Sequence, residues 1–132
     1  MPATPHCLVF VYGTLKRGGS NHAQLEGARF IGDARLRPGY TMYSLGAYPG
    51  LVAEPASADR VTGEIWAVSH AMLTRLDAFE GVDEGLYQRA AAPLSEFPSD
   101  LSPTDAARVE MYLYLRPVTG RERLGESWPV RR

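Results

Sequence analysis

The sequence predicts an α+β fold, a small mixed β-barrel with a few flanking helices. Short runs of β-branched and aromatic residues recur along the chain with turn residues between them, and only one segment has clear helical periodicity. The chain has 132 residues, of which 45% are hydrophobic and 22% charged, so we expect residues 1–132 to form a single domain. A barrel of this size can hold one small ligand in its mouth.

Six segments are predicted to be strands. Residues 7–12 (CLVFVY) are apolar without interruption, which is typical of a strand buried on both faces, whereas residues 61–68 and 109–115 alternate. The remaining predicted strands are 28–36, 40–45 and 87–93. We expect a turn at 47–50, a surface loop over the Pro-, Ser- and Asp-rich residues 97–106, and an irregular tail from residue 117.

The clearest helix follows Ser69, whose side chain can cap the first turn. Its apolar residues fall at helical spacing and form one stripe: Met72, Leu73, Leu76 and Phe79. Gly81 and Gly85 end this helix. A shorter helix is predicted over residues 21–26, with Asn21 as its N-cap and Gly27 as its stop.

Composition argues against several classes of function. The formal net charge is -1 and the arginines are scattered, so nothing favours binding to nucleic acid or to a membrane. A single cysteine, Cys7, precludes an internal disulfide and fits a cytoplasmic location. Residues 1–6 lack the basic flank of a signal peptide. The spacing of the three histidines (His6, His22 and His70) matches no compact metal motif, so we expect no metal site.

The first candidate site is the glycine turn that follows the first predicted strand, from Tyr12 to Gly18. Gly13 lets the backbone approach a ligand closely, and successive backbone N–H groups in such a turn can hold a carboxylate or an oxyanion. The segment has neither the Gly-Lys-Ser/Thr ending of a phosphate loop nor the spacing of a dinucleotide fingerprint. Taken alone, a glycine at a strand end is more often simply a turn.

The second candidate is Glu80 at the end of the predicted helix, beside the apolar stripe. The negative end of the helix dipole and partial burial both raise the pKa of a carboxyl group, which suits a general acid/base. On its own, however, this pattern favours a solvated glutamate at a frayed helix end. Tyr87, Tyr112 and Tyr114 lie in predicted strands, where packing is the default role, although a tyrosine at a barrel mouth can orient a polar ligand.

Together these segments resemble the γ-glutamyl cyclotransferase-like family, which includes the AIG2-like proteins and the γ-glutamylamine cyclotransferases. The resemblance rests on segments spread over most of the chain: Val9 to Gly18 with Asn21-His22, Tyr48-Pro49-Gly50-Leu51, Gly63-Glu64-Ile65-Trp66, Leu76-Asp77 with Phe79-Glu80-Gly81, Tyr87 with Arg89, Met111 to Tyr114, and Gly125-Glu126-Ser127-Trp128. The order and spacing of these segments favour the catalytic interpretation of Glu80 over the solvated one.

The resemblance implies a β-barrel with flanking helices, a pocket at its mouth and no metal or organic cofactor. It implies a small-molecule γ-glutamyl substrate whose α-amino and α-carboxylate end is held by the turn, and an acid/base role for Glu80. The turn residues concerned are Tyr12, Gly13, Thr14 and Leu15. Tyr87 and Tyr114 are implied as further pocket residues. The implied products are 5-oxoproline and a free amine.

Two alternatives stay open. The same fold can serve as a non-catalytic module that binds a small amino-acid-like ligand, and that reading gains if Glu80 is fully solvated or far from Gly13. A different acyl-transfer enzyme would use Cys7 or Thr14 as nucleophile, and it needs a nearby base, for which no histidine is obviously placed. The sequence identifies neither the leaving amine nor the oligomeric state.

Overall fold

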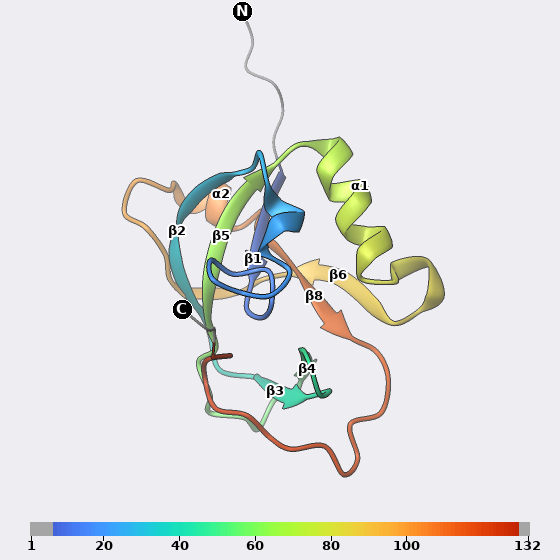
Figure 1. The fold of residues 1–132 in the computed structure, drawn as a ribbon. Coiled ribbons are helices and arrows are strands. Elements are labelled where there is room, and N and C mark those ends of the chain that lie inside the picture. Colours follow the sequence, from blue (N-terminus) through green and yellow to red (C-terminus); the bar gives the residue numbers. More distant parts are fainter. Residues whose placement is uncertain (1–6, 130–132) are drawn as a thin grey trace, which may run out of the picture.

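The computed structural model describes residues 7–129, which form eight strands and two α-helices (Figure 1). The strands are β1 (Cys7–Val11), β2 (Arg29–Leu36), β3 (Tyr40–Ser44), β4 (Pro49–Ala53), β5 (Thr62–Val68), β6 (Tyr87–Ala91), β7 (Leu94–Glu96) and β8 (Glu110–Tyr114). The helices are α1 (His70–Phe79) and α2 (Pro103–Ala106), and two 3₁₀ turns are η1 (His22–Leu25) and η2 (Val82–Glu84). Within these residues no helix is long and apolar enough to cross a membrane.

The larger sheet is mixed and has the strand order β6-β8-β1-β5-β2-β7. β1 and β8 are parallel neighbours, and the other pairs of this sheet are antiparallel. β3 and β4 form a separate antiparallel hairpin below it (Figure 1). The sheet curls into a half-barrel, so the predicted α+β class with a mixed, barrel-like sheet is confirmed, although the sheet does not close on itself.

The curled sheet separates two apolar cores, which explains why its central strands lack polar faces. Phe10 and Ile65 face one core together with the hairpin, whereas Val9 and Val68 face the other together with α1. A strand covered on both sides needs apolar residues at successive positions, as in the CLVFV run of β1. Burying side chains of this size contributes about 1.5–3 kcal/mol each.

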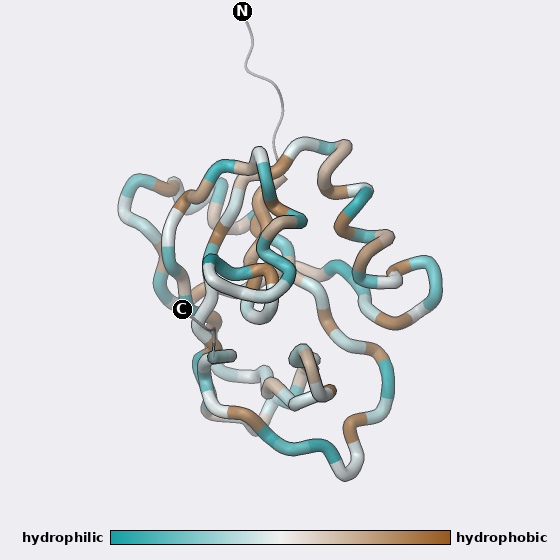
Figure 2. The backbone as a smooth tube through the Cα atoms, viewed as in Figure 1, coloured by the Kyte–Doolittle hydropathy of each residue, from teal (hydrophilic) through white to brown (hydrophobic). Residues whose placement is uncertain are grey.

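α1 begins and ends close to where the sequence predicts. The Ser69 hydroxyl accepts a hydrogen bond from the Met72 backbone N–H at 3.1 Å, so the predicted N-cap is confirmed. Hydrophobic and hydrophilic residues alternate along the turns of this helix (Figure 2). Met72, Leu73 and Leu76 are buried as predicted. Phe79, the last residue of the predicted apolar stripe, is 43% exposed in the last turn.

Several local predictions differ from the structure. β4 and β7 were not predicted, and the expected turn at 47–50 already contains the first residues of β4. Within the expected loop 97–106, Ser102 caps the short helix α2 through the Asp105 backbone N–H. The helix predicted over 21–26 is one 3₁₀ turn that the Asn21 side chain does not cap. These elements are short, and they are stabilised by contacts with distant strands that a local pattern does not contain.

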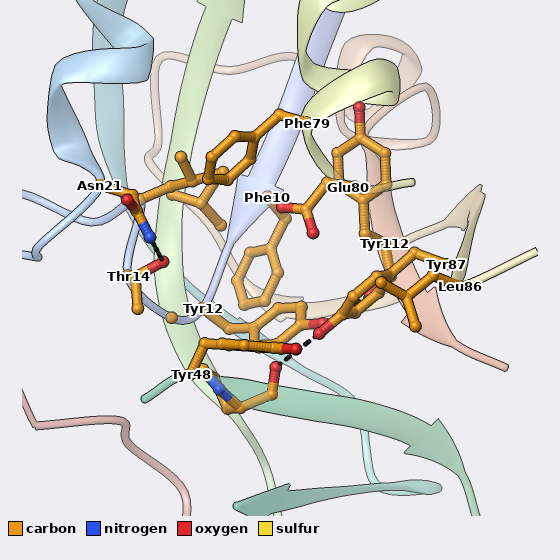
Figure 3. Close-up of a pocket in the computed structure, with 14 residues that line it drawn as sticks. Phe10, Tyr12, Thr14, Asn21, Tyr48, Phe79, Glu80, Leu86, Tyr87 and Tyr112 are labelled. Atoms are coloured by element: carbon orange, nitrogen blue, oxygen red, sulfur yellow. Dashed lines mark hydrogen bonds between the residues drawn. The ribbon is translucent and has the colours of Figure 1, made fainter. Parts of the chain in front are cut away.

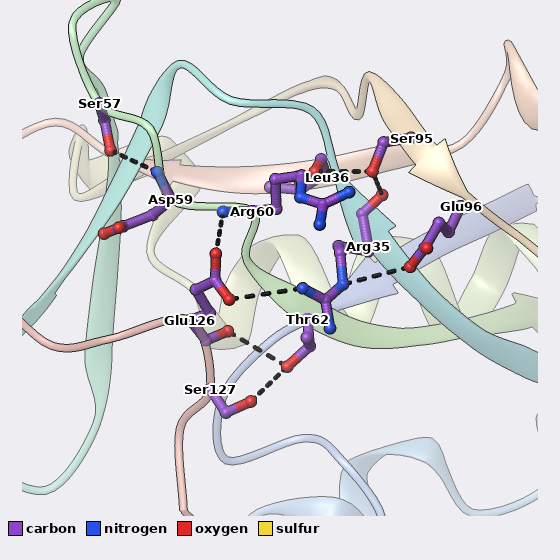
Figure 4. A network of polar contacts seen from close by, with 10 residues as sticks. All are labelled: Arg35, Leu36, Ser57, Asp59, Arg60, Thr62, Ser95, Glu96, Glu126 and Ser127. Atoms are coloured by element: carbon purple, nitrogen blue, oxygen red, sulfur yellow. Dashed lines mark hydrogen bonds and ion pairs between the residues drawn. The ribbon is translucent and has the colours of Figure 1, made fainter.

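The tail after β8 is largely irregular, as predicted, but it is fixed along the molecule. It passes beside the hairpin, where Tyr43 and Arg123 form an isolated β-bridge and the Leu124 backbone N–H donates to the Met42 carbonyl at 2.8 Å. It then crosses to β5, where the Glu126 backbone carbonyl accepts a hydrogen bond from the Thr62 backbone N–H at 2.7 Å. Figure 4 shows the polar network around this crossing, in which Arg35 pairs with Glu96 and Glu126. Residues 1–6, where no signal peptide is expected, lie outside the described residues.

Candidate active site

A cavity of about 210 Å³ opens at the end of β1, between the C-terminal end of α1, the start of β6 and the hairpin (Figure 3). The residues that line it come from parts of the chain far apart in sequence: Phe10, Val11, Tyr12, Gly13, Thr14, Leu15, Asn21, Tyr48, Pro49, Phe79, Glu80, Leu86, Tyr87 and Tyr112. Both sequence-predicted candidates, the glycine turn and Glu80, therefore face the same cavity.

The glycine turn is held in place by hydrogen bonds at its edges. The Asn21 backbone N–H donates to the Thr14 carbonyl at 3.0 Å, and the Asn21 side-chain amide donates to the Thr14 hydroxyl at 2.9 Å. Within residues 7–129, the backbone N–H groups of Gly13, Thr14 and Leu15 have no acceptor. Three unpartnered backbone donors at the wall of a cavity form the kind of site that binds a carboxylate or an oxyanion.

Gly13 is required by packing as well as by its place beside the cavity. A Cβ atom added there would lie 2.7 Å from Cγ and 2.8 Å from Cδ of the Pro49 ring. The backbone φ angle of Gly13 is not positive, so left-handed geometry is not the reason for glycine. The close approach of β4 to the end of β1 thus gives this glycine a structural explanation that the sequence alone did not reveal.

Glu80 follows the last residue of α1 and its carboxyl group faces the cavity, near Phe10 and Phe79 (Figure 3). Its backbone N–H donates to the Leu76 carbonyl at 2.8 Å, and Gly81, at a φ of 70°, then turns the chain away from the helix. Within the described residues the carboxyl group has no hydrogen bond or ion pair. Burial raises the pKa of Glu80 from 4.5 to about 7.

Three tyrosines form the wall around the Glu80 carboxyl group, and each hydroxyl group already has an acceptor. Tyr12 donates to the Tyr112 carbonyl at 2.6 Å, and Tyr87 donates to the Pro49 carbonyl at 2.9 Å. The Tyr112 hydroxyl donates to the Asp77 carboxylate at 2.7 Å. Burial raises the pKa of all three tyrosines, so they stay neutral. For Tyr112 the hydrogen bond to Asp77 raises the pKa further, and the negative charge of Glu80 adds a smaller rise for each of the three.

Tyr114, which the resemblance implies as a pocket residue, lies behind the wall. Its ring packs edge-on against the ring of Tyr87, with a centroid distance of 5.3 Å, and it contacts the backbone at Gly50. It is not among the residues that line the cavity, whereas Tyr112 is. The alternation of residues 109–115 places Tyr112 and Tyr114 on the same face of β8, so the sequence indicates the face but not which tyrosine reaches the cavity.

Sequence reasoning about site residues missed several members of the cavity wall. Tyr48, Asn21, Phe79 and Leu86 line it in addition to Tyr112. Tyr48 and Asn21 belong to the segments that carry the family resemblance, which is the signal that could have pointed to them. Leu86 has no comparable signal, because its place depends on the turn between α1 and β6.

Cys7 and His70 form a pair that the sequence did not predict. The Cys7 sulfur lies 3.5 Å from His70 Nδ1, so the expectation that no histidine is placed near this cysteine is wrong. The pair lies where β1 begins and α1 begins, and neither residue lines the cavity. Thr14 lines the cavity, but its hydroxyl contacts the Asn21 amide, which is not a base. Among the residues described, no group of three or more potential ligands could hold a metal ion.

The fold and the site define a class of protein: a half-barrel with a small cavity at one end, lined by aromatic rings, unpartnered backbone donors and one carboxyl group of raised pKa. Residues 9–130 match the family model described as gamma-glutamyl cyclotransferase, AIG2-like. The chain belongs to this family.

Individual relatives agree with this assignment. A Vibrio cholerae protein named as a candidate gamma-glutamylcyclotransferase is 47% identical over 75 residues, which are 57% of this chain and 63% of that protein. The human gamma-glutamylaminecyclotransferase is 36% identical over 120 residues, covering 83% of this chain and 78% of the human protein. The crystal structure of a mouse AIG2-like protein superposes with a TM-score of 0.72 at 28% identity, over 94% of this chain and 88% of the mouse chain.

The chain spans only part of some relatives. The matched region is 63% of the Vibrio cholerae protein and 50% and 57% of relatives from Arabidopsis thaliana and Danio rerio.

Proposed function

We propose that this protein is a γ-glutamyl cyclotransferase that acts on a γ-glutamyl amide and releases 5-oxoproline and a free amine. The observation that carries the proposal is the position of Glu80, whose unpaired carboxyl group, with a pKa of about 7, shares one small cavity with the Gly13 turn. A carboxyl group that titrates near neutral pH can both accept and return a proton during turnover. Family membership supports the same reaction.

The chemistry needs no protein nucleophile because the substrate carries its own. The α-amine attacks the γ-carbonyl carbon, a new carbon–nitrogen bond closes the five-membered lactam, and the bond to the leaving amine breaks. Tethering of nucleophile and carbonyl in one molecule can lower the barrier by roughly 7–11 kcal/mol when the geometry is right. The remaining task of the enzyme is to move one proton from the attacking amine to the leaving nitrogen.

In this proposal Glu80 moves that proton. The α-ammonium group first loses one proton to solvent. As the neutral α-amine attacks, the Glu80 carboxylate accepts a second proton from it, and the resulting carboxylic acid donates that proton to the leaving nitrogen, so the residue returns to its starting state. The unpartnered N–H groups of Gly13, Thr14 and Leu15 bind the α-carboxylate of the substrate or the oxyanion of the intermediate. Tyr12 and Tyr87 hold the turn and the hairpin in position through their hydrogen bonds and serve as neutral walls. Tyr114 supports the ring of Tyr87 from behind.

The test is release of 5-oxoproline from a panel of γ-glutamyl amides, followed by mass spectrometry, with the variant Glu80→Gln beside the native protein. We expect release by the native protein and a loss of about 100-fold or more in the variant, because a general acid/base contributes about 100- to 10,000-fold. Glu84→Gln is the matched control, since Glu84 is exposed on η2 and does not line the cavity. Near-normal turnover by folded Glu80→Gln would refute the mechanism.

A non-catalytic binding protein on the same fold remains the second candidate. A solvated Glu80 distant from Gly13 would favour this hypothesis, but the two residues line one cavity and Glu80 is partly buried. If no compound of a broad panel released 5-oxoproline but a γ-glutamyl amide bound measurably, the binding protein would be favoured. The acyl-transfer alternative has less support, because Cys7 lies outside the cavity and the Thr14 hydroxyl is hydrogen-bonded to the Asn21 amide, which is not a base.

A further inference from the structure

The cavity has a closed end and an aromatic opening. Tyr12, Tyr87 and Tyr112 are 3–6% exposed. Tyr48 and Phe79 are the lining residues that are exposed, at 40% and 43%. Figure 3 shows their rings on opposite sides of the space that the Glu80 carboxyl group faces. The two rings therefore flank the way out.

The size of the cavity decides which part of a substrate meets these rings. Its volume of about 210 Å³ is below the roughly 300–1,000 Å³ of ordinary ligand pockets, so only a small group fits inside. The proposed γ-glutamyl group occupies this space when its reacting atoms lie beside Glu80 and Gly13. The leaving amine then extends outward between Tyr48 and Phe79.

The opening lacks a partner for a negative charge on the leaving amine. None of the residues that line the cavity is Lys, Arg or His, and the one ionisable carboxyl group, Glu80, repels an anion. The two cations that follow Leu15 in the glycine turn are engaged elsewhere. Lys16 donates to the Trp128 carbonyl at 2.7 Å, and Arg17 binds Glu64 and Asp33. Arg75 lies one turn before Phe79 on α1 and does not line the cavity.

From these observations we infer that the enzyme selects γ-glutamyl amides of uncharged, aromatic or otherwise apolar amines, and discriminates against γ-glutamyl amino acids and peptides, whose leaving amine carries a carboxylate. The inference rests on the proposed function and adds its substrate class. An apolar group between two aromatic rings leaves water and gains contact, whereas a carboxylate there loses hydration without a compensating cation. Phe79 and Tyr48 are the specificity-determining residues.

Three probes separate these effects. γ-Glutamylphenethylamide and γ-glutamylphenylalanine differ only by one carboxylate, and γ-glutamylmethylamide lacks the ring. We expect kcat/KM for the phenethylamide to exceed that for each of the other two by about 10-fold or more, in line with what one well-placed apolar group or one unpaired charge is worth. Equal or faster turnover of γ-glutamylphenylalanine would overturn the inference.

The variant Phe79→Ala locates the effect. We expect it to lower the ratio of kcat/KM for the phenethylamide to that for the methylamide about 10-fold, while 5-oxoproline is still released from the methylamide. Phe97→Ala is the matched control, because Phe97 is 37% exposed and does not line the cavity. An unchanged ratio in Phe79→Ala, or the same change in Phe97→Ala, would contradict the assignment.

A failure of the proposed function gives a different result. In that case none of the probes releases 5-oxoproline, and calorimetric titration of the native protein with the same three compounds tests the inference by binding alone. Tighter binding of the phenethylamide than of γ-glutamylphenylalanine would support the selection rule without the reaction. Binding of γ-glutamylphenylalanine that is as tight, or no binding of the phenethylamide, would overturn it.

Discussion

Glu80 and Glu64 are both withdrawn from solvent, yet their carboxyl groups have opposite electrostatic character. Burial raises the pKa of Glu80 to about 7. Burial also acts to raise the pKa of Glu64, but hydrogen bonds from Arg17 and Trp66 outweigh it, and the pKa of Glu64 falls below 4.5. Burial alone therefore does not determine how a carboxyl group titrates in this protein.

The hydrogen-bond donors around the two groups explain the difference. Glu64 accepts from the Arg17 backbone N–H at 2.9 Å, from the Arg17 guanidinium at 3.0 Å and from the Trp66 indole N–H at 3.1 Å. Glu80 has no such donor within the described residues and faces aromatic rings. Donors stabilise the ionised form, whereas an apolar wall stabilises the neutral form.

The contrast also separates two roles in the molecule. Glu64 fixes the glycine turn to β5, because Arg17 belongs to that turn and its guanidinium also lies over the Phe30 ring at 3.9 Å. Within the described residues Glu80 makes no comparable connection, and in the proposed mechanism it exchanges a proton with the substrate. The presence or absence of fixed donors thus separates a structural carboxylate from the carboxyl group that we propose to be reactive.

The largest effect that distinguishes the two is the pH dependence of activity. With Glu80 as the proton acceptor, kcat/KM should fall about tenfold for each pH unit below about 7, because only the ionised form can accept a proton. The measurement is the pH profile of 5-oxoproline release between pH 5 and 8. Glu64→Gln should keep the same acid limb if the variant folds, since Glu64 does not line the cavity. A limb that moves or disappears in Glu64→Gln would show that the two glutamates are not independent.

The next largest effect is on the free energy of unfolding, which Glu80→Gln and Glu64→Gln should change in opposite directions. The pKa of Glu80 in the folded protein lies above its value in the unfolded chain. The contribution of this group to the stability of the fold is therefore complete below about pH 4.5 and is lost as the pH rises through about 7. Glu80→Gln removes this cost, so at pH 8 the variant should be more stable than the native protein by up to about 3 kcal/mol. Near pH 4 the two should differ little.

Glu64 should behave in the reverse way. Because the pKa of Glu64 is lowered in the folded protein, the ionised group contributes to stability above its unfolded-state pKa of about 4.5. This contribution is lost as the pH falls through the pKa of the folded state. Glu64→Gln should therefore cost about 1–3 kcal/mol at pH 7, with a smaller cost near pH 3. Urea unfolding of Glu80→Gln at pH 4 and pH 8, and of Glu64→Gln at pH 3 and pH 7, makes the comparison. Changes of the same sign in both variants would mean that the donors around Glu64 do not cause the difference.

The sequence predicted the class of fold because the hydrophobic pattern carries it locally. The apolar run of β1, the stripe of α1 and the alternation of β5 and β8 can each be read from neighbouring residues. β4 and β7 could not be read in this way. β4 begins with Pro49-Gly50, a typical turn sequence, and exists because it pairs with β3 and Gly50 fits against Tyr114. β7 has three residues and depends on pairing with β2.

The candidate site was predictable in its residues more than in its geometry. The resemblance named Glu80 and the glycine turn, and the structure brings them to one cavity. The raised pKa of Glu80 depends on aromatic side chains from other strands, and the sequence cannot show that Tyr112 reaches the cavity while Tyr114 lies behind Tyr87. The sequence also could not show why residue 13 is glycine. The reason is the close approach of the Pro49 ring, which belongs to β4, a strand that the sequence did not predict.

The smallest predicted effect isolates a single donor to Glu64. Trp66→Phe keeps an aromatic ring beside Phe30 and His22 but removes the indole N–H that donates to Glu64. Because Arg17 still donates two hydrogen bonds, we expect a rise in the Glu64 pKa and a cost of only about 1 kcal/mol at pH 7. Carbon-13 NMR titration of the glutamate side chains measures the pKa, with Glu80 as the internal control. A shift of Glu80 as large as that of Glu64 would mean that Trp66→Phe changes the packing of β5 as a whole. A shift confined to Glu64 would mean that each donor acts separately on the titration of its carboxylate, as the contrast between the two glutamates requires.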